Sequence, residues 1–171
     1  MKPIKSVAAI HDLSGYGRCS LSVIVPIFSV MGVQAVAIPT AVLSTHTGGF
    51  GDVVMKDLTE FVDQSLSHYQ RIGLDFDCIY TGFLGSKEQI RHCLDYIETY
   101  PNALKVVDPV MGDNGKAYRT YTNEMCRSMV ELAKAADLIT PNKTEMFMLL
   151  NKPFNPASLT QQEAKTNLLK L

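Results

Sequence analysis

Short apolar runs alternate with longer segments of helical spacing along most of the chain, and this alternation constrains the fold more than any other feature. Five runs have the length and composition of buried β-strands, and they cover residues 7–10, 34–38, 77–81, 104–107 and 138–140. Strands that alternate with helices are typical of a parallel sheet with helices packed on its faces. The sequence therefore predicts a three-layer α/β/α domain with a mostly parallel sheet.

The segments between these runs carry the signals of amphipathic helices. Helices are expected at residues 19–31, 52–69, 86–100, 124–136, 143–150 and from 160 to Leu171. Two helix starts are marked by Asp52 and Ser86, whose side chains can accept hydrogen bonds from the first backbone N–H groups of a helix. Pro26 should bend the first helix or mark its first turns.

The loops after the predicted strands hold most of the flexible and polar residues. They cover residues 11–17, 40–51, 81–86, 108–115 and 140–145. Right-handed crossovers between parallel strands bring such loops to one edge of the sheet. Open α/β sheets bind their ligands at that edge, so the sequence predicts a ligand site built from these loops.

The loop after the fourth run carries two carboxylates that lie five residues apart. Residues 104–107 have the composition of a strand buried on both faces, and Pro109 cannot donate to a sheet ladder, so pairing should stop at Asp108. Asp108 and Asp113 could hold Mg²⁺ directly or through its waters, beside phosphate groups of a substrate. The alternative is a solvated turn whose acids only cap a helix.

Size and charge narrow the class of protein. The 171 residues predict one domain over 1–171. With 16 basic and 17 acidic residues, nothing indicates binding to nucleic acid or to an anionic membrane. The four cysteines lack metal-site spacing, and no apolar run has the length of a signal peptide core or a membrane span. We therefore expect a soluble cytoplasmic protein.

Four of the loops resemble motifs of one enzyme family, the vitamin B6 (pyridoxal) kinases of the ribokinase superfamily. Ser44-Thr-His-Thr-Gly48 is similar to their Ser-Asn-His-Thr loop, and Thr81-Gly-Phe-Leu-Gly-Ser86 to their Ser-Gly-Tyr-Leu-Gly-Ser. Asp108-Pro-Val-Met-Gly112 is their Asp-Pro-Val-Met-Gly, and Thr140-Pro-Asn-Lys-Thr-Glu145 resembles their Pro-Asn-x-x-Glu. The motifs occur in the family's order and span nearly the whole chain. The resemblance implies a ribokinase-like fold.

The same resemblance implies a reaction and its cofactors. Such kinases use ATP and Mg²⁺ to phosphorylate the 5′-hydroxymethyl group of pyridoxal, pyridoxine or pyridoxamine, which salvages the vitamin as pyridoxal 5′-phosphate, and they tend to form homodimers. Carried over by motif, the ATP-binding residues would be Asp108, Asp113, Thr140, Asn142, Thr144 and Glu145. Asp108 and Glu145 would be the metal ligands, since Mg²⁺ takes only one or two carboxylates beside substrate phosphates. The alternative for Asn142 and Glu145 is a cap at a helix start.

On the vitamin side, the positions that match or flank ring-contacting residues are Asp12, Tyr16, His46, Thr47, Gly48 and Phe83. The family often has Ser where Asp12 stands and Tyr where Phe83 stands. An acid at position 12 could accept a hydrogen bond from a protonated ring nitrogen or an amine. Because Asp12-Leu-Ser-Gly15 also resembles the opening motif of the hydroxymethylpyrimidine kinases, such a kinase of thiamine synthesis is the alternative. His11 and Tyr118 are assigned no role.

The family's catalytic base is the Asp of a Gly-x-Gly-Asp segment in the C-terminal half, and residues 1–171 contain no equivalent region. The resemblance therefore places the base beyond Leu171, and no catalytic residue is assigned within the chain. Gly49-Phe-Gly-Asp52 fits the pattern, but it lies in the loop after the second strand, on the substrate side, so Asp52 is expected to be a helix cap.

Kinases of this kind have roughly 250–300 residues. We therefore expect the chain to correspond to about the first three-fifths of one and to be inactive alone. A truncated, non-catalytic module that binds a vitamer is a further alternative.

Overall fold

A computed structural model describes residues 4–155, 162–163 and 166. Its main element is a six-stranded sheet in the order β3-β2-β1-β4-β5-β8, and every neighbouring pair is parallel except β2 and β3. Its strands are β1 (Ser6–Tyr16), β2 (Gln34–Thr45), β3 (Met55–Asp57), β4 (Cys78–Thr81), β5 (Leu104–Val107) and β8 (Leu138–Ile139). The helices are α1 (Leu21–Val30), α2 (Thr59–Arg71), α3 (Lys87–Thr99), α4 (Asn123–Lys134) and α5 (Lys143–Leu149). A separate hairpin pairs β6 (Gly112–Asp113) with β7 (Lys116–Ala117).

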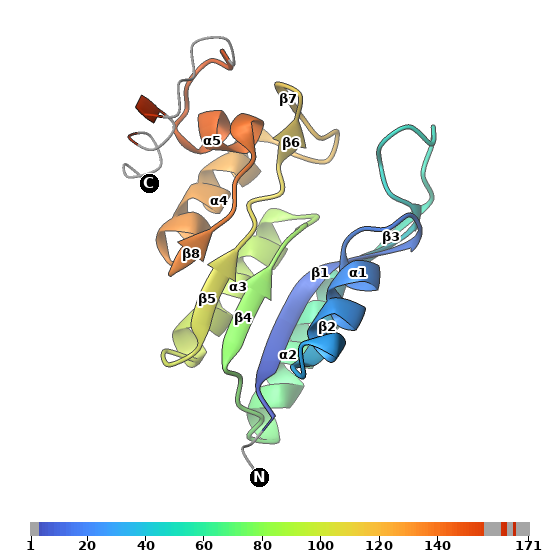
Figure 1. Cartoon of the computed structure of the whole chain (residues 1–171), viewed down its shortest axis with the longest axis vertical. Helices are drawn as coiled ribbons and strands as arrows, with labels where there is room; N and C mark the ends of the chain where they lie inside the picture. Colours follow the sequence, from blue (N-terminus) through green and yellow to red (C-terminus); the bar gives the residue numbers. More distant parts are fainter. Residues whose placement is uncertain (1–3, 156–161, 164–165, 167–171) are drawn as a thin grey trace.

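Helices cover both faces of the sheet, as predicted. Figure 1 shows α1 on one face and α2, α3 and α4 on the other. The chain runs from β1 outward to β2, then returns past β1 to β4 and continues to β5 and β8. Right-handed crossovers that run in opposite directions place their helices on opposite faces, which explains the separate position of α1. The reversal also creates a topological switch point between β1 and β4, where open α/β sheets bind ligands.

The main core lies between the sheet and helices α2, α3 and α4. Ile10, Ile79 and Val107 come from three neighbouring strands and are fully buried in one cluster with Ile90 of α3 and Met129 of α4. Burying each side chain of this size stabilises the fold by about 1.5–3 kcal/mol. This packing fixes the sheet that carries the strand-end loops.

The two longest strands extend into segments that we predicted to be loops. β1 continues to Tyr16 and β2 to Thr45, so much of 11–17 and 40–51 is extended backbone. The pairing of these strands shifts register between His11 and Leu13, which is a β-bulge. Bulges re-aim side chains and are frequent beside active sites. Polar residues therefore stand on rigid strands here.

The prediction of a helix over residues 52–69 is wrong in its first turns. α2 begins at Thr59, after the short strand β3 has paired antiparallel with β2. Asp52 lies in the preceding loop, and the side chain that accepts a hydrogen bond from the Thr59 backbone N–H (2.9 Å) belongs to Asp57. By contrast, Ser86 caps α3 as predicted, with its Oγ accepting from the Gln89 backbone N–H at 3.1 Å.

The C-terminal segment is described in only a few places. The helix expected from residue 160 to Leu171 lies almost entirely outside the described residues, and so does Leu171 itself. The expectation that the catalytic base lies beyond Leu171 thus stays a prediction, which the structure of this chain does not test.

None of the helices in the described part of the chain is both long and apolar enough to cross a membrane.

Candidate functional site

The strand register aligns the ends of β4, β5 and β8 with the middle of β1 at the carboxyl edge of the sheet. One row of paired residues crosses the sheet through Ile10, Thr81, Val107 and Ile139. The next residue on each strand, in the order from β1 to β8, is His11, Gly82, Asp108 and Thr140. The structure thus brings together the strand-end loops that the sequence placed at one edge.

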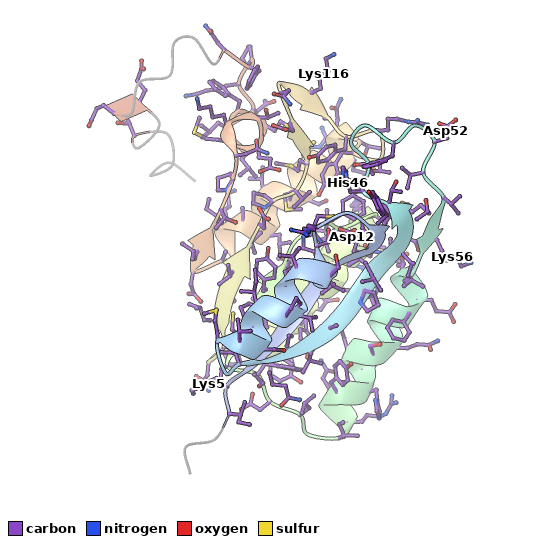
Figure 2. All side chains as sticks on the ribbon, turned by 45° about the vertical axis from the view of Figure 1, so that its right-hand side comes forward. Lys5, Asp12, His46, Asp52, Lys56 and Lys116 are labelled. Carbon is purple, nitrogen blue, oxygen red and sulfur yellow. The ribbon has the colours of Figure 1, made fainter. Side chains whose placement is uncertain are left out.

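A cavity of about 600 Å³ opens at this edge. Six residues with a predicted site role line it: Asp12, His46, Thr47, Gly48, Phe83 and Asp113. In Figure 2, Asp12 and His46 lie near each other toward the carboxyl end of β1, while Lys5 marks the opposite end of that strand. The predicted vitamin side therefore forms one continuous hollow, with Asp113 from the predicted phosphate side at its wall.

Asp12 is a buried carboxylate in the wall of this cavity, with 5% of its surface exposed. Its Oδ1 accepts a hydrogen bond from Ser20 Oγ at 2.6 Å, and its Oδ2 accepts one from Ser14 Oγ at 2.8 Å. His11 Nδ1 lies 2.8 Å from Oδ1. Burial alone would raise the pKa of Asp12, but the contacts with His11, Ser20 and Ser14 together lower it. Asp12 is thus an ionised carboxylate in the wall of the cavity. Three of its roughly four acceptor positions are occupied by His11, Ser14 and Ser20, which leaves one for a ligand.

His11 is a member of the site that sequence reasoning missed. His11 is 7% exposed, lines the cavity and stacks on the ring of Tyr80, with ring centroids 6.3 Å apart and ring planes at 30°. The sequence shows only that His11 follows a short apolar run. Its burial results from the strand pairing of β1 with β4, which a single sequence does not specify.

Asp108 stands at the end of β5 and faces Tyr80. Asp108 Oδ2 lies 3.5 Å from the Tyr80 hydroxyl. Burial raises the pKa of Asp108, and the nearby His11, Thr140 and Tyr80 offset part of that rise. The geometry connects the two acids of the site through one aromatic contact: Asp12 touches His11, His11 stacks on Tyr80, and Tyr80 faces Asp108.

Asn142 and Glu145 form a capping box at the start of α5, the alternative considered for them from the sequence. Asn142 Oδ1 accepts from the Glu145 backbone N–H (3.0 Å), and Glu145 Oε2 accepts from the Asn142 N–H (2.7 Å). Glu145 Oε1 also accepts from the Met111 N–H at 3.3 Å, and Thr144 Oγ1 accepts from the Gly115 N–H at 2.9 Å. Burial, together with the charge of Asp108, raises the pKa of Glu145 to about 7. These bonds tie the Asp108 loop to α5, and nucleotide binding by Asn142, Thr144 and Glu145 stays a prediction.

The carboxylates of the site suit a magnesium ion that takes most of its ligands from water and substrate. Among the residues that the structure describes, no group of three or more His, Cys, Asp or Glu side chains could hold a metal ion. Both oxygens of Glu145 already accept backbone N–H groups, whereas within the described residues the Asp108 carboxylate faces the Tyr80 hydroxyl at 3.5 Å. A site with Asp108 as its main protein ligand would suit Mg²⁺, which keeps several waters and binds substrate phosphates beside one or two carboxylates.

The residues at the mouth of the cavity form a cluster of rings. Tyr16 is 66% exposed and meets Phe50 edge-on at 5.6 Å between centroids, and His46 meets Phe50 edge-on at 4.7 Å. Tyr16 therefore lies at the rim and does not line the cavity. Tyr118, which was assigned no role, does line it.

A buried glutamine fixes the loop that presents Phe83 to the cavity. Gln89 is fully buried, its Oε1 accepts from the Gly85 N–H (2.7 Å), and its Nε2 donates to the Thr40 carbonyl (2.9 Å). Thr40 Oγ1 in turn donates to the Phe83 carbonyl at 2.8 Å. Phe83 is thus held in place in the wall of the cavity that Asp12 also lines, and its apolar ring suits a flat ligand.

Comparisons with known proteins, by sequence and by structure, all identify kinases. Residues 25–171 match the family model described as phosphomethylpyrimidine kinase. A pyridoxal kinase of Pasteurella multocida (strain Pm70) is 30% identical over 178 residues, which cover 99% of this chain and 60% of the relative. The chain spans about half to three-fifths of the length of such curated relatives.

Two solved structures are similar in both sequence and fold. One is a Bacteroides thetaiotaomicron protein assigned as a phosphomethylpyrimidine kinase, in a crystal form with pyridoxal: 44% identity, a TM-score of 0.93, and coverage of 98% of this chain and 59% of that one. The other is the pyridoxal kinase of Lactobacillus plantarum, at 32% identity and a TM-score of 0.90, with coverage of 98% and 60%. The ribokinase-like fold and the kinase relatives expected from the motifs are thereby confirmed.

Proposed function

The chain belongs to the phosphomethylpyrimidine kinase family, and from this premise we propose that the protein phosphorylates a vitamin B6 vitamer with ATP and Mg²⁺. The acceptor would be the 5′-hydroxymethyl group of pyridoxal, pyridoxine or pyridoxamine, and the product a 5′-phosphate. The observation that carries the proposal is the ionised, buried Asp12 that lines, together with Phe83, a cavity at the switch point of the sheet.

The cavity suits a pyridine ring that carries a proton. Asp12 has one acceptor position left for a ring N–H or an amine, and Phe83 offers an apolar face for stacking. The similar Bacteroides thetaiotaomicron structure contains pyridoxal, and the curated relatives are pyridoxal kinases. These points favour a B6 vitamer over a pyrimidine.

On the phosphate side, Asp108 would be the main Mg²⁺ ligand and Glu145 a second one. Asp113, Thr140, Asn142 and Thr144 would lie near the phosphates. Bound Mg²⁺ would neutralise the charge that develops on the transferred phosphoryl group. Asp108 and Thr140 follow the paired residues Val107 and Ile139 at the carboxyl edge of the sheet.

The catalytic base would come from a segment beyond Leu171, because the Gly-x-Gly-Asp segment of the family has no counterpart in residues 1–171 apart from the Asp52 loop. The relatives are longer than this chain. A homodimer and a cytoplasmic location, both expected from the sequence, stay predictions.

One other function has specific support. The description of the matching family model favours a hydroxymethylpyrimidine kinase. A vitamer-binding module without activity, the other alternative considered from the sequence, is distinguished by an activity assay.

One assay separates these functions. The complete protein is incubated with ATP and Mg²⁺ and either pyridoxal or hydroxymethylpyrimidine, and the products are followed by the absorbance of pyridoxal 5′-phosphate and by ADP release. We expect a kcat/KM at least tenfold higher with pyridoxal. The reverse order would establish the pyrimidine kinase. Binding of pyridoxal without turnover of either substrate would favour the module.

A further inference from the structure

We propose that His11 is a positioning residue of the kinase reaction, which acts through Asp12 by holding that carboxylate in the orientation that the substrate ring requires. This inference rests on the proposed function and deepens it, because it assigns to the ring-binding acid a partner that none of the recognised motifs contains.

One ring nitrogen of His11 contacts both the carboxylate and the backbone of Asp12. His11 Nδ1 lies 2.8 Å from Asp12 Oδ1, and the Asp12 backbone N–H points at the same nitrogen from 2.9 Å. A neutral Nδ1 without hydrogen would point its lone pair at a carboxylate oxygen. With a hydrogen on Nδ1, the ring donates to the Asp12 carboxylate and gives up the hydrogen bond from the Asp12 backbone N–H. The bond gained is charge-assisted and stronger than the neutral bond lost. The ionised Asp12 therefore favours the Nδ1–H form of His11.

The surroundings leave Asp12 dependent on this bond. Within the described residues, Asp12 makes an ion-pair contact with His11 and with no lysine or arginine. Its remaining partners are the neutral hydroxyls of Ser14 and Ser20. His11 is thus the strongest donor available to a buried anion, and the loss of a donor to a buried charge costs more than the loss of a neutral one.

The ring of His11 also packs against residues of β4 and the loop that follows it. Gly82 lies against the ring so closely that a side chain at that position would overlap the imidazole, and the ring of Tyr80 stacks on it with the planes at 30°. These contacts come from β4 and the residue after it, whereas Asp12 belongs to β1. His11 therefore transmits the position of β4 to the substrate-facing acid on β1, which is what a positioning residue does.

The test compares two variants of the complete protein that replace different ring nitrogens. In His11→Asn the amide nitrogen of the asparagine can take the place of Nδ1, whereas the amide of the glutamine in His11→Gln reaches only the place of Nε2. We expect His11→Asn to keep the KM for pyridoxal within about threefold of wild type. His11→Gln should raise it by about 10–100-fold, the effect of a lost hydrogen bond to a charged group. The KM for ATP should change in neither.

A second measurement separates positioning from simple packing. If His11 acts through Asp12, His11→Gln should have little further effect on the KM for pyridoxal in an Asp12→Asn background. Additive effects, or equal effects of the two His11 variants on both substrates, would overturn the inference. If His11→Gln does not fold, His11→Asn decides alone: a tenfold rise in its KM for pyridoxal is the overturning result, and a KM near wild type supports the inference.

A wild-type protein that phosphorylates neither pyridoxal nor the pyrimidine would refute the proposed function, and the positioning role would fall with it. An active wild type with an unaffected His11→Gln variant would refute the positioning role alone.

Discussion

The imidazole of His11 packs directly on the α-carbon of Gly82, so that a Cβ at position 82 would overlap the ring. The two residues follow the paired residues Ile10 and Thr81 of adjacent parallel strands, and the Gly82 N–H donates to the Ile10 carbonyl at 2.9 Å. They therefore meet at the switch point of the sheet, where the cavity opens. Glycine is needed here for a close approach, since the backbone of Gly82 is not among those with a positive φ.

Gly82→Ala should consequently displace His11 and damage the site. We expect the free energy of unfolding to fall by about 1–3 kcal/mol, the usual cost of overpacking, and the KM for pyridoxal to rise at least tenfold. Urea unfolding and steady-state kinetics of the complete protein measure the two effects.

Gly85→Ala is the matched control, because a Cβ at Gly85 would meet its nearest neighbour, Asp57 Oδ2, at an ordinary 3.5 Å. This glycine also lacks a positive φ and lies in the same loop. Stability and kinetics close to wild type are expected for the control. Equal losses in both variants would mean that the loop tolerates no side chain at all and that the contact with His11 is not the cause.

Asp12→Ala should raise the KM for the vitamer and leave the KM for ATP nearly unchanged. Asp12 is the buried anion of the cavity, and its removal leaves a protonated ring nitrogen or an amine without a partner. A rise of about tenfold or more corresponds to one lost charge-assisted hydrogen bond. Asp52→Ala, which removes a fully exposed acid from the neighbouring loop, should change neither constant. A raised KM for ATP in Asp12→Ala would show that the segment containing Asp12 lies on the ATP side and not on the vitamin side.

Asp108→Asn should lower kcat strongly while the protein stays folded. A carboxylate beside Mg²⁺ and the transferred phosphoryl group stabilises charge only if it is ionised and in place, and removal of one such contact costs on the order of 10²-fold or more. Glu145→Gln should act in the same direction and increase the Mg²⁺ concentration needed for half-maximal rate. Wild-type rates for both variants at ordinary Mg²⁺ would exclude this placement of the metal.

Much of the architecture could be predicted because its signals are local. Ser86 stands directly before helical periodicity and caps α3 as predicted. Asn142 caps α5, which was the alternative to its predicted nucleotide-binding role. The alternation of apolar runs with helices likewise specifies strand-end loops that gather at one edge. Four of these loops also match the motifs of one family.

The sequence predictions that were wrong or incomplete concerned features that depend on contacts between distant segments of the chain. Asp52 is followed by apolar residues with helical spacing, but β2 continues to Thr45 and pairs with β3, which delays α2 to Thr59. The role of His11 was missed for a similar reason: its neighbour Gly82 belongs to a distant segment of the chain, and only the register of β1 with β4 brings them together.

Glu145 should make the stability of the metal-free protein fall as pH rises. Its pKa is about 7 in the folded protein, against an ordinary value of 4.5. Between these values the folded state binds more protons than the unfolded state, so the free energy of unfolding decreases with rising pH, and the loss is complete above pH 7. The loss should be on the order of 1–3 kcal/mol.

Glu145→Gln removes this titration and supplies the control. Urea unfolding in EDTA at about pH 4.5 and about pH 8, on either side of the titration, should show a smaller decrease for the variant than for wild type. The opposite contribution of Asp12, whose pKa is lowered, is common to both proteins and cancels. Parallel pH dependences for the two proteins would show that Glu145 titrates normally.

Residues 1–171 alone should not catalyse phosphoryl transfer. The reaction depends on positioning, on charge stabilisation and on a base oriented toward the attacking hydroxyl. The chain supplies a cavity with Asp12 and a carboxylate at Asp108, but up to Leu171 its sequence holds no Gly-x-Gly-Asp segment other than the loop that ends at Asp52. Asp52 is fully exposed and lies 3.7 Å from Arg119. Loss of the base alone should lower the rate by about 10²–10⁴-fold.

The test of this inactivity incubates the 171-residue fragment with ATP, Mg²⁺ and pyridoxal and follows the absorbance of pyridoxal 5′-phosphate. The complete protein is the positive control, because it should carry the base that the family places beyond Leu171. Turnover of the fragment at an ordinary kinase rate would contradict the prediction. Loss of that turnover in Asp52→Asn would then identify Asp52 as the base, since it is the one acid of the chain that stands in the family's Gly-x-Gly-Asp pattern.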